Sequence, residues 1–247
     1  MSITSEADWK GLREIGRVVR LTLDALERQV QAGVSTGELD QVAAQIFAAN
    51  GACSAPAMVY GFPGTVLICV NDEVVHGIPG SRRLKPGDVV KLDVTAEKGG
   101  YMADAARTVL VGNASPCAQR LVACVHSAFE QGLKVARSGN RVSEIGRAIE
   151  AEVNRHRFSV IRALQGHGIG KTIHEPPSVP NYYNPRQMDV LTEGLVVTIE
   201  PIISCGSEQA FEDRDGWTVR TNDGSLSAHH EHTVVITRDC PVLLTAA

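Results

Sequence analysis

The chain has 247 residues, 43% of them hydrophobic, and a formal net charge of −4 at pH 7. This length and composition allow a substantial hydrophobic core in one large domain or two small ones. The weak negative charge excludes a general electrostatic attraction to nucleic acid or to an anionic membrane.

The sequence carries no sign of export or membrane insertion. Residues 1–10 are polar and lack the apolar region of a secretory signal, and no uncharged apolar run approaches membrane-spanning length. The six cysteines show no C-x-x-C spacing, which indicates reduced thiols. The expected location is therefore the cytoplasm, without a nucleic-acid or membrane partner.

Apolar residues at helical spacing predict a first helix over residues 6–30, with Gly33 as its stop signal. A second helix is predicted from Ser35 to about Asn50, and Ser35 with Glu38 has the spacing of a capping box. The remaining predicted elements come in groups: strands at 64–75, 89–95 and 107–111, helices at 116–137 and 143–155, and strands at 158–163, 195–203, 217–221 and 232–237. Paired helices and runs of strands predict an α+β fold.

One pattern occurs twice in the chain. Residues 84–93 and 191–200 share the form L-x-x-G-x-V-V-x-[L/I]-[D/E], about 107 residues apart, and they end on Asp93 and Glu200. An ionised carboxylate at the end of an apolar strand is costly unless it is paired, hydrogen-bonded or bound to a metal. The repeat therefore marks two acids that need an explanation.

A second feature recurs at nearly the same offset. Ser35 and Ser143 each stand where a helical pattern opens, and each is a candidate N-cap. We interpret the two recurrences as an internal duplication within one domain, residues 1–247. Its two related halves would cover about 1–125 and 126–247, and they would bring the two strand-ending acids to equivalent places.

Four carboxylates and one imidazole stand at strand edges or in a glycine-rich loop. They are Asp93, Asp104, Glu200, Glu231 and His167, the last of which lies in GHGIG within an ordered, site-forming loop predicted over the following two dozen residues. Divalent ions favour carboxylate oxygens, and imidazole suits Mn, Fe, Co or Zn. Four carboxylates can neutralise two such ions ~3.5–4 Å apart, which activate a hydroxide for attack on an acyl or phosphoryl centre.

Each of these residues also has an ordinary structural explanation. A strand aspartate is often exposed or paired with a base, and Lys91 and Arg107 are available. A lone loop histidine such as His167 is more often hydrogen-bonded than a ligand. Residues 229–232, HHEH, are similar to a metal-binding tract, although neighbouring side chains on a strand point to opposite faces. The symmetry of the repeated acids favours a site.

Five segments together resemble the signatures of type I methionine aminopeptidases, in the order and spacing of that family and over essentially the whole chain. They are NDEVVHGIP, KLDVT, GHGIGKTIHEPP, TIEP and EHTVVIT. The resemblance implies the pita-bread fold, a pseudo-twofold α+β architecture that agrees with the duplication. It also implies an enzyme that removes the N-terminal methionine of nascent proteins when the second residue is small, with a metal-bridging hydroxide attacking the scissile carbonyl.

The resemblance assigns a role to each polar residue. It implies that two divalent metal ions per chain (Co, Mn, Fe, Zn or Ni) are held by Asp93, Asp104, His167, Glu200 and Glu231. Asp104 and Glu231 would bridge the ions, and Glu200 would shuttle the proton of the attacking water. A monomer is expected, with the nascent peptide as substrate and the ribosome as the expected place of action.

The resemblance also implies a substrate pocket. His76 would contact the substrate backbone and His174 would stabilise the tetrahedral intermediate. An apolar cup for the methionine side chain would be formed by Tyr60, Phe62, Leu67 and Trp217. Leu67 departs from the family, which usually has a cysteine there, and Ile173 stands where an aromatic residue is common. These departures leave the strictness of methionine selection open.

Three other classes were weighed. Xaa-Pro aminopeptidases and prolidases share the fold and the two metals, but usually carry an additional N-terminal domain. Creatinase-like enzymes share the fold without the metals. Some pita-bread proteins are non-catalytic binding modules associated with ribosomes or chromatin, and these typically lose ligands. All five ligand positions are filled in this chain.

Overall fold

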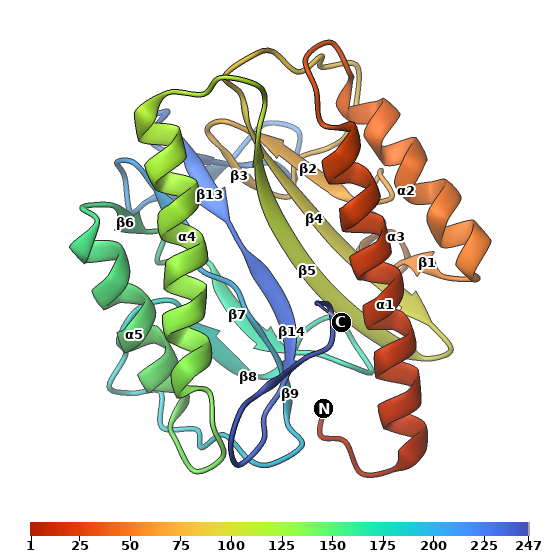
Figure 1. The fold of residues 1–247 in the computed structure, drawn as a ribbon, viewed down its shortest axis with the longest axis vertical. Helices are drawn as coiled ribbons and strands as arrows, with labels where there is room; N and C mark the ends of the chain where they lie inside the picture. Colours follow the sequence, from red (N-terminus) through yellow and green to blue (C-terminus); the bar gives the residue numbers. More distant parts are fainter. Residues whose placement is uncertain (247) are drawn as a thin grey trace.

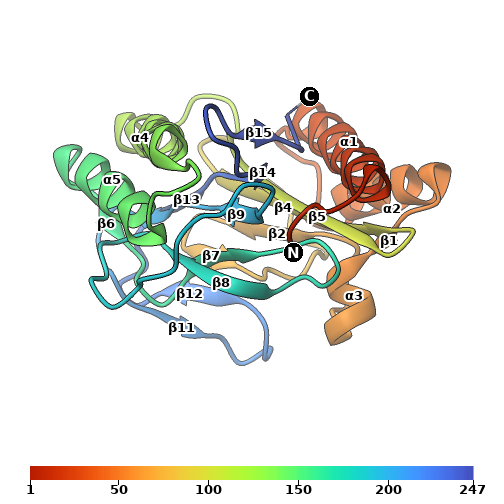
Figure 2. The same ribbon diagram turned by 90° about the horizontal axis from the view of Figure 1, so that it is seen from below.

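The computed structural model describes residues 1–246. Its four long helices lie in two pairs, α1 (Glu6–Gln29) beside α2 (Thr36–Asn50) and α4 (Pro116–Val135) beside α5 (Val142–Arg155) (Figure 1). All four lie on one side of the main sheet, whereas the short helix α3 (Ala55–Tyr60) lies on the other (Figure 2). The second side of the sheet is thus left free of long helices.

The helix ends follow local side-chain chemistry. In α2 the capping box is present, because Ser35 Oγ accepts a hydrogen bond from Glu38 N and the Glu38 carboxylate accepts one from Ser35 N. In α5 the prediction was wrong: the N-cap is Arg141, which makes no side-chain capping bond, and Ser143 lies inside the helix. The first helix ends at Val30 as its C-cap, before Gly33 is reached.

The main sheet has nine strands, paired antiparallel throughout, in the order β1-β4-β5-β14-β9-β7-β8, with β2 on β4 and β15 on β14. The strands are β1 (Cys53–Ser54), β2 (Leu67–Val70), β4 (Val89–Lys98), β5 (Tyr101–Leu110), β7 (Gln165–Gly168), β8 (Glu175–Pro180), β9 (Val196–Ile199), β14 (Glu231–Val235) and β15 (Val242–Leu243). Its centre is the contact between β5 and β14, where the N-terminal and C-terminal parts of the chain meet.

Two three-stranded sheets complete the fold. The first, in the order β13-β10-β6, contains β13 (Ser227–His229), β10 (Ile202–Ser204) and β6 (Ser159–Val160). The second, in the order β11-β12-β3, contains β11 (Ala210–Glu212), β12 (Val219–Thr221) and β3 (Glu73–Val75).

The apolar core is divided between the two helix pairs. One cluster of buried side chains lies between α1, α2 and the strands β2, β4 and β5, with Leu23 and Leu92 fully buried. The other lies between α4, α5 and the strands β9 and β14, with Leu121 and Val197 fully buried. Each helix pair therefore stabilises its own part of the continuous sheet.

Two predicted strands are interrupted in the structure. The run 64–75 divides into β2 and β3, because Asn71 turns the chain with a positive φ of 62°. The run 195–203 divides into β9 and β10 at Glu200-Pro201. The segment predicted as loop, residues 166–191, contributes most of β7 and all of β8.

The repeated segments have matching local conformations. Gly87 and Gly194, at the same place in the pattern, both have positive φ, 94° and 83°, and each is followed by a buried strand, β4 or β9. A glycine adopts this backbone without the steric cost that other residues meet. None of the helices in residues 1–246 has the length and apolar character that crossing a membrane requires.

Candidate metal centre

A cavity of about 1090 Å³ is lined by every residue that the sequence nominated for the site: Tyr60, Phe62, Leu67, His76, Asp93, Asp104, His167, His174, Glu200, Trp217 and Glu231. The lining side chains come from both parts of the chain. Carboxylates, imidazoles, aromatic rings and aliphatic side chains all line the cavity. The structure thus brings the nominated residues together.

Strand register explains why the carboxylates converge. Ala106 on β5 pairs with Asp93 on β4 and, on its other side, with Glu231 on β14. Directly opposed residues of antiparallel strands present their side chains on the same face, as do residues two apart on one strand. Asp104 therefore shares that face with them. Glu200 follows the Ile199–His232 pair, so it stands opposite Glu231.

Hydrogen bonds fix His167 and Glu200 beside each other. Thr198 Oγ1 donates to Glu200 Oε1 at 2.9 Å and accepts a hydrogen bond from His167 N at 3.1 Å. The His167 ring contacts the Gly168 carbonyl through Nδ1 at 2.9 Å, where Nδ1–H would donate. This leaves Nε2 with a free lone pair, 3.6 Å from Glu200 Oε1.

Three of the four carboxylates each have a buried oxygen that lacks a hydrogen-bond partner. Asp93 Oδ1, Asp104 Oδ1 and Glu231 Oε1 are buried and have no hydrogen-bond partner. Burial and the neighbouring carboxylates raise the pKa values of Asp93, Glu200 and Glu231 well above their ordinary range. Burial raises the pKa of Asp104 to about 6. Four acids so placed are stabilised as carboxylates by a cation in their midst.

Two groups of side chains have ligand atoms close enough to share an ion. Asp104, His167 and Glu231 form one group, and Asp93, His229 and Glu231 form the other. Glu231 belongs to both. The donor set, carboxylate oxygens with imidazole nitrogen, matches a transition-metal ion better than calcium or magnesium. The residues present therefore fit the divalent metal ions that the sequence predicts.

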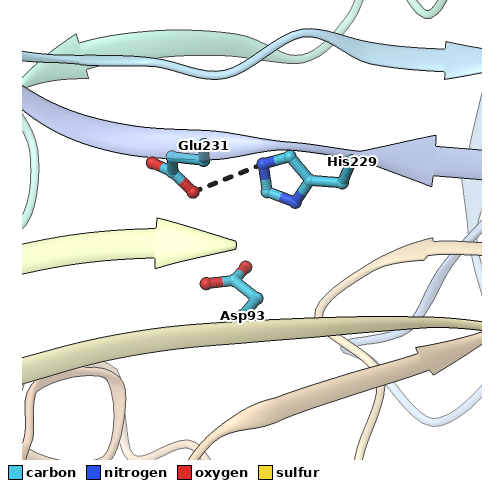
Figure 3. Close-up of side chains that lie close together, drawn as sticks. All are labelled: Asp93, His229 and Glu231. Carbon is cyan, nitrogen blue, oxygen red and sulfur yellow. Dashed lines mark ion pairs between the residues drawn. The ribbon is translucent and has the colours of Figure 1, made fainter. Parts of the chain in front are cut away.

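His229 is the member of this site to which the sequence analysis assigned no role. Figure 3 shows its ring and the Glu231 carboxylate facing the same space as Asp93. The rings of His230 and His232 instead pack against Phe129 of α4, with centroids 5.0 and 5.2 Å from it. A signal was available: His229 precedes Glu231 by two residues, and such residues on extended chain share a face.

The apolar part of the cavity is built around two aromatic rings. Phe62 and Trp217 meet edge to face with centroids 5.2 Å apart. Leu67 pairs with Asp93 across β2 and β4, so its side chain lies next to the carboxylates. Tyr60 reaches from α3 and its hydroxyl lies 2.6 Å from Nδ1 of His174.

The two histidines outside the carboxylate cluster are open to the cavity. His76 directly follows β3 and has a positive φ of 60°, an unusual conformation for a residue other than glycine. Such strain is often found at functional sites. Desolvation lowers the pKa values of both His76 and His174, and His174 lowers that of His76 further. Both rings are therefore neutral near pH 7.

Comparison with known proteins gives one consistent result. A family model described as metallopeptidase family M24 matches residues 10–238. Methionine aminopeptidase 2 of Bacillus subtilis (strain 168) is 42% identical over 247 residues, covering 99% of both chains. The crystal structure of methionine aminopeptidase from Rickettsia prowazekii superimposes with a TM-score of 0.95 at 36% identity, covering 99% of this chain and 100% of that one.

More distant similarity extends to a second group of enzymes. Prolidase from Pyrococcus furiosus is 21% identical, with a TM-score of 0.80, and the match covers 99% of this chain but 65% of that one. At this identity the likeness shows the fold alone. The α+β, pita-bread fold predicted from the sequence is confirmed by these neighbours.

Proposed function

The chain belongs to metallopeptidase family M24, and we propose from this premise that it is a metal-dependent methionine aminopeptidase, which removes the N-terminal methionine of proteins. The observation that carries the proposal is the cluster of carboxylates, three of which have a buried oxygen without a hydrogen-bond partner, in a cavity that aromatic side chains also line. The Xaa-Pro aminopeptidase and binding-module alternatives are not favoured, because the relatives of high identity are methionine aminopeptidases.

In this proposal two divalent ions lie among Asp93, Asp104, His167, Glu200 and Glu231. The assignment is supported by their common face of the sheet and by the free lone pair of the imidazole. Manganese, iron, cobalt, nickel and zinc all suit this donor set. Bound ions would neutralise the carboxylates, polarise the scissile carbonyl and lower the pKa of a water molecule.

The protein side chains position the substrate and move the proton. Glu200, held by Thr198, takes the proton of the attacking water and passes it to the departing amine. His174, neutral and held at Nδ1 by the Tyr60 hydroxyl, presents Nε2 to the developing oxyanion. His76 contacts the peptide backbone from the end of β3.

The methionine side chain enters the apolar part of the cavity. Phe62, Leu67 and Trp217 surround its thioether, with Tyr60 at the edge. A small second residue of the peptide is required, because a bulky one would overpack the space beside the metal centre at a cost of ~1–3 kcal/mol or more. The enzyme acts in the cytoplasm as a monomer on nascent peptides that leave the ribosome.

Peptide turnover tests the proposal. The purified protein, freed of metal and supplied with Mn²⁺ or Co²⁺, is expected to cleave Met-Ala-Ser and to leave Met-Lys-Ser and Xaa-Pro peptides intact. Addition of a chelator should abolish the activity and metal should restore it. Equal turnover of Met-Ala-Ser and Met-Lys-Ser, or preference for Xaa-Pro peptides, would refute the proposed specificity.

A further inference from the structure

We infer that His229 is a ligand of the second metal ion, so that each of the two ions receives one imidazole, His167 on one and His229 on the other. The inference rests on the proposed function, because it presupposes two ions in the centre. It adds a sixth residue to the ligand set that the family resemblance implies. It also gives the Asp93 side of the centre a nitrogen donor that the other five residues do not supply.

The distances around His229 are those of side chains that share an ion. Its Nε2 lies 3.3 Å from Glu231 Oε2 and 3.6 Å from Glu200 Oε2. Ligands that bind a tetrahedral ion with bonds of ~2.1 Å stand about 3.4 Å from one another. The ligand atoms of Asp93, His229 and Glu231 all lie within 4.8 Å of one another (Figure 3).

The nitrogen that faces the carboxylates lies near Glu200 and Glu231 and makes no hydrogen bond. Nε2 of His229 is buried without a hydrogen-bond partner, and the side chain is 2% exposed. Leaving a buried polar atom unpaired is unfavourable, because the atom loses its hydrogen bonds to water without replacement. The opposing oxygens, Asp93 Oδ1 and Glu231 Oε1, are unpaired as well. One ion bound among them would satisfy the nitrogen and both carboxylates together.

The backbone holds the ring in this place. Thr108 of β5 accepts a hydrogen bond from His229 N at 2.9 Å and donates one to His229 O at 2.7 Å through the same hydroxyl. On its other side His229 pairs with Ile202 of β10. The residue is therefore fixed from two strands before any ion binds, as a preorganised ligand must be.

The proposed ligand has a consequence for metal preference. Imidazole favours zinc, nickel and iron, whereas an all-oxygen set suits manganese and magnesium. Loss of His229 should therefore weaken binding of the second Zn²⁺ ion more than binding of the second Mn²⁺ ion. A residue that merely packs beside Glu231 would affect the two metals equally.

The test compares the full-length protein with His229→Gln and with His230→Gln. The control replaces the neighbouring buried histidine, whose ring faces α4 instead of the cavity. Each metal-free protein is titrated calorimetrically with Zn²⁺ and with Mn²⁺. X-ray absorption of the samples with two equivalents of Zn²⁺ then counts the imidazoles per ion. Circular dichroism and thermal unfolding verify that all three proteins are folded.

The wild type and His230→Gln are expected to bind two ions with, on average, one imidazole per zinc. In His229→Gln the imidazole count should fall to half, and the dissociation constant of the second zinc should rise at least about tenfold. An unchanged imidazole count overturns the inference, even if affinity falls, because His229 would then only position Glu231. A wild type that binds one zinc with one imidazole also overturns it. A wild type that binds no metal refutes the proposed function itself.

Discussion

Ala106 is the smallest side chain in a row that crosses the main sheet, and it separates two of the carboxylates. The row runs from Leu67 through Asp93, Ala106 and Glu231 to Glu200, by strand pairing and its continuation. The methyl group of Ala106 leaves space above the sheet between Asp93 and Glu231, and a larger side chain at this position would fill that space. The row thus places the proposed apolar wall, metal site and proton-carrying acid side by side.

Replacing Glu200 with Gln should lower kcat for Met-Ala-Ser by at least about 100-fold, the usual contribution of a general base. The amide keeps the shape of the side chain and can still accept the Thr198 hydrogen bond, so the fold should be unchanged. The control is Glu208→Gln, an exposed carboxylate that pairs with Arg162. Retention of more than about a tenth of wild-type kcat in a folded Glu200→Gln protein would contradict the assigned role.

Replacing Leu67 with Cys should change the selectivity of the enzyme for the N-terminal side chain of the substrate more than it changes the turnover of methionine substrates. The thiol is smaller than the isobutyl group, and a methylene of misfit in an apolar pocket changes specificity by ~1–3 kcal/mol. We therefore expect kcat/KM for norleucine- and ethionine-type substrates to change more than that for methionine. The new thiol should also react with an alkylating reagent, and substrate should protect it.

The wild-type protein is the control for alkylation at this site. Cys69, two residues further on, is buried, and burial raises the pKa of its thiol to about 12, so it should stay unreactive. Unchanged selectivity together with no protectable thiol in Leu67→Cys would place Leu67 outside the methionine pocket.

At the scale of elements, the long amphipathic helices could be predicted from sequence, whereas several short elements could not. The helix α1 carries its apolar period over 24 residues and begins at Ser5, whose side chain caps it. The helix α3 and the strands β7, β11 and β13 have three to six residues. Segments this short have no period to detect, and pairing with distant strands decides their conformation.

The site shows the same limit. Acids that end an apolar strand violate a burial rule, so Asp93 and Glu200 could be found from sequence alone. His229 violates no rule by itself. Its spacing of two residues from Glu231 predicts a shared face, but β13 ends at His229 and β14 begins at Glu231, and the two strands pair with β10 and with β5. Only the tertiary structure shows that the shared face is the one that lines the cavity.

The capping box of α2 should contribute measurably to stability. Ser35→Ala removes the acceptor for Glu38 N, and loss of a serine N-cap typically costs ~1 kcal/mol of unfolding free energy. Ser143→Ala is the matched control, because Ser143 lies within α5 and caps nothing. The unfolding free energy of Ser143→Ala should stay within about 0.5 kcal/mol of the wild-type value, since alanine has a higher helix propensity than serine. Urea denaturation measures both, and equal losses would contradict the different roles of the two serines.

At the scale of the molecule, we propose that the sheet joins two related halves and that the metal centre lies at their junction. Asp93 and Asp104 come from the strands packed under α1 and α2, whereas Glu200 and Glu231 come from those packed under α4 and α5. Neither set contains enough ligands for two ions. Metal bound at β5 and β14 would therefore hold the two parts of the chain together, and its removal should lower the stability of the whole fold.

Metal removal should lower the melting temperature, and by more at pH 8 than at pH 5. In the metal-free protein, burial raises the folded pKa of Asp104 to about 6, and burial with the neighbouring carboxylates raises the pKa values of Asp93, Glu200 and Glu231 well above their ordinary range. The unfolded chain releases these protons near pH 4, so stability is fully present below that pH and falls as the pH rises through the folded pKa values.

Metal binding should reverse this dependence, because bound cations keep the carboxylates ionised and compete with protons less as the pH rises. A ligand present at 100 times its dissociation constant stabilises the folded state by ~2.7 kcal/mol per site, which corresponds to roughly 5–10 °C in a chain of this size. Calorimetric scans with excess Mn²⁺ and with chelator, at pH 5 and pH 8, measure the difference. Asp104→Asn should show a smaller metal-dependent rise at pH 8 than the wild type. If metal raises the melting temperature of the wild type as much at pH 5 as at pH 8, the buried acids are not the cause of the metal-dependent stability.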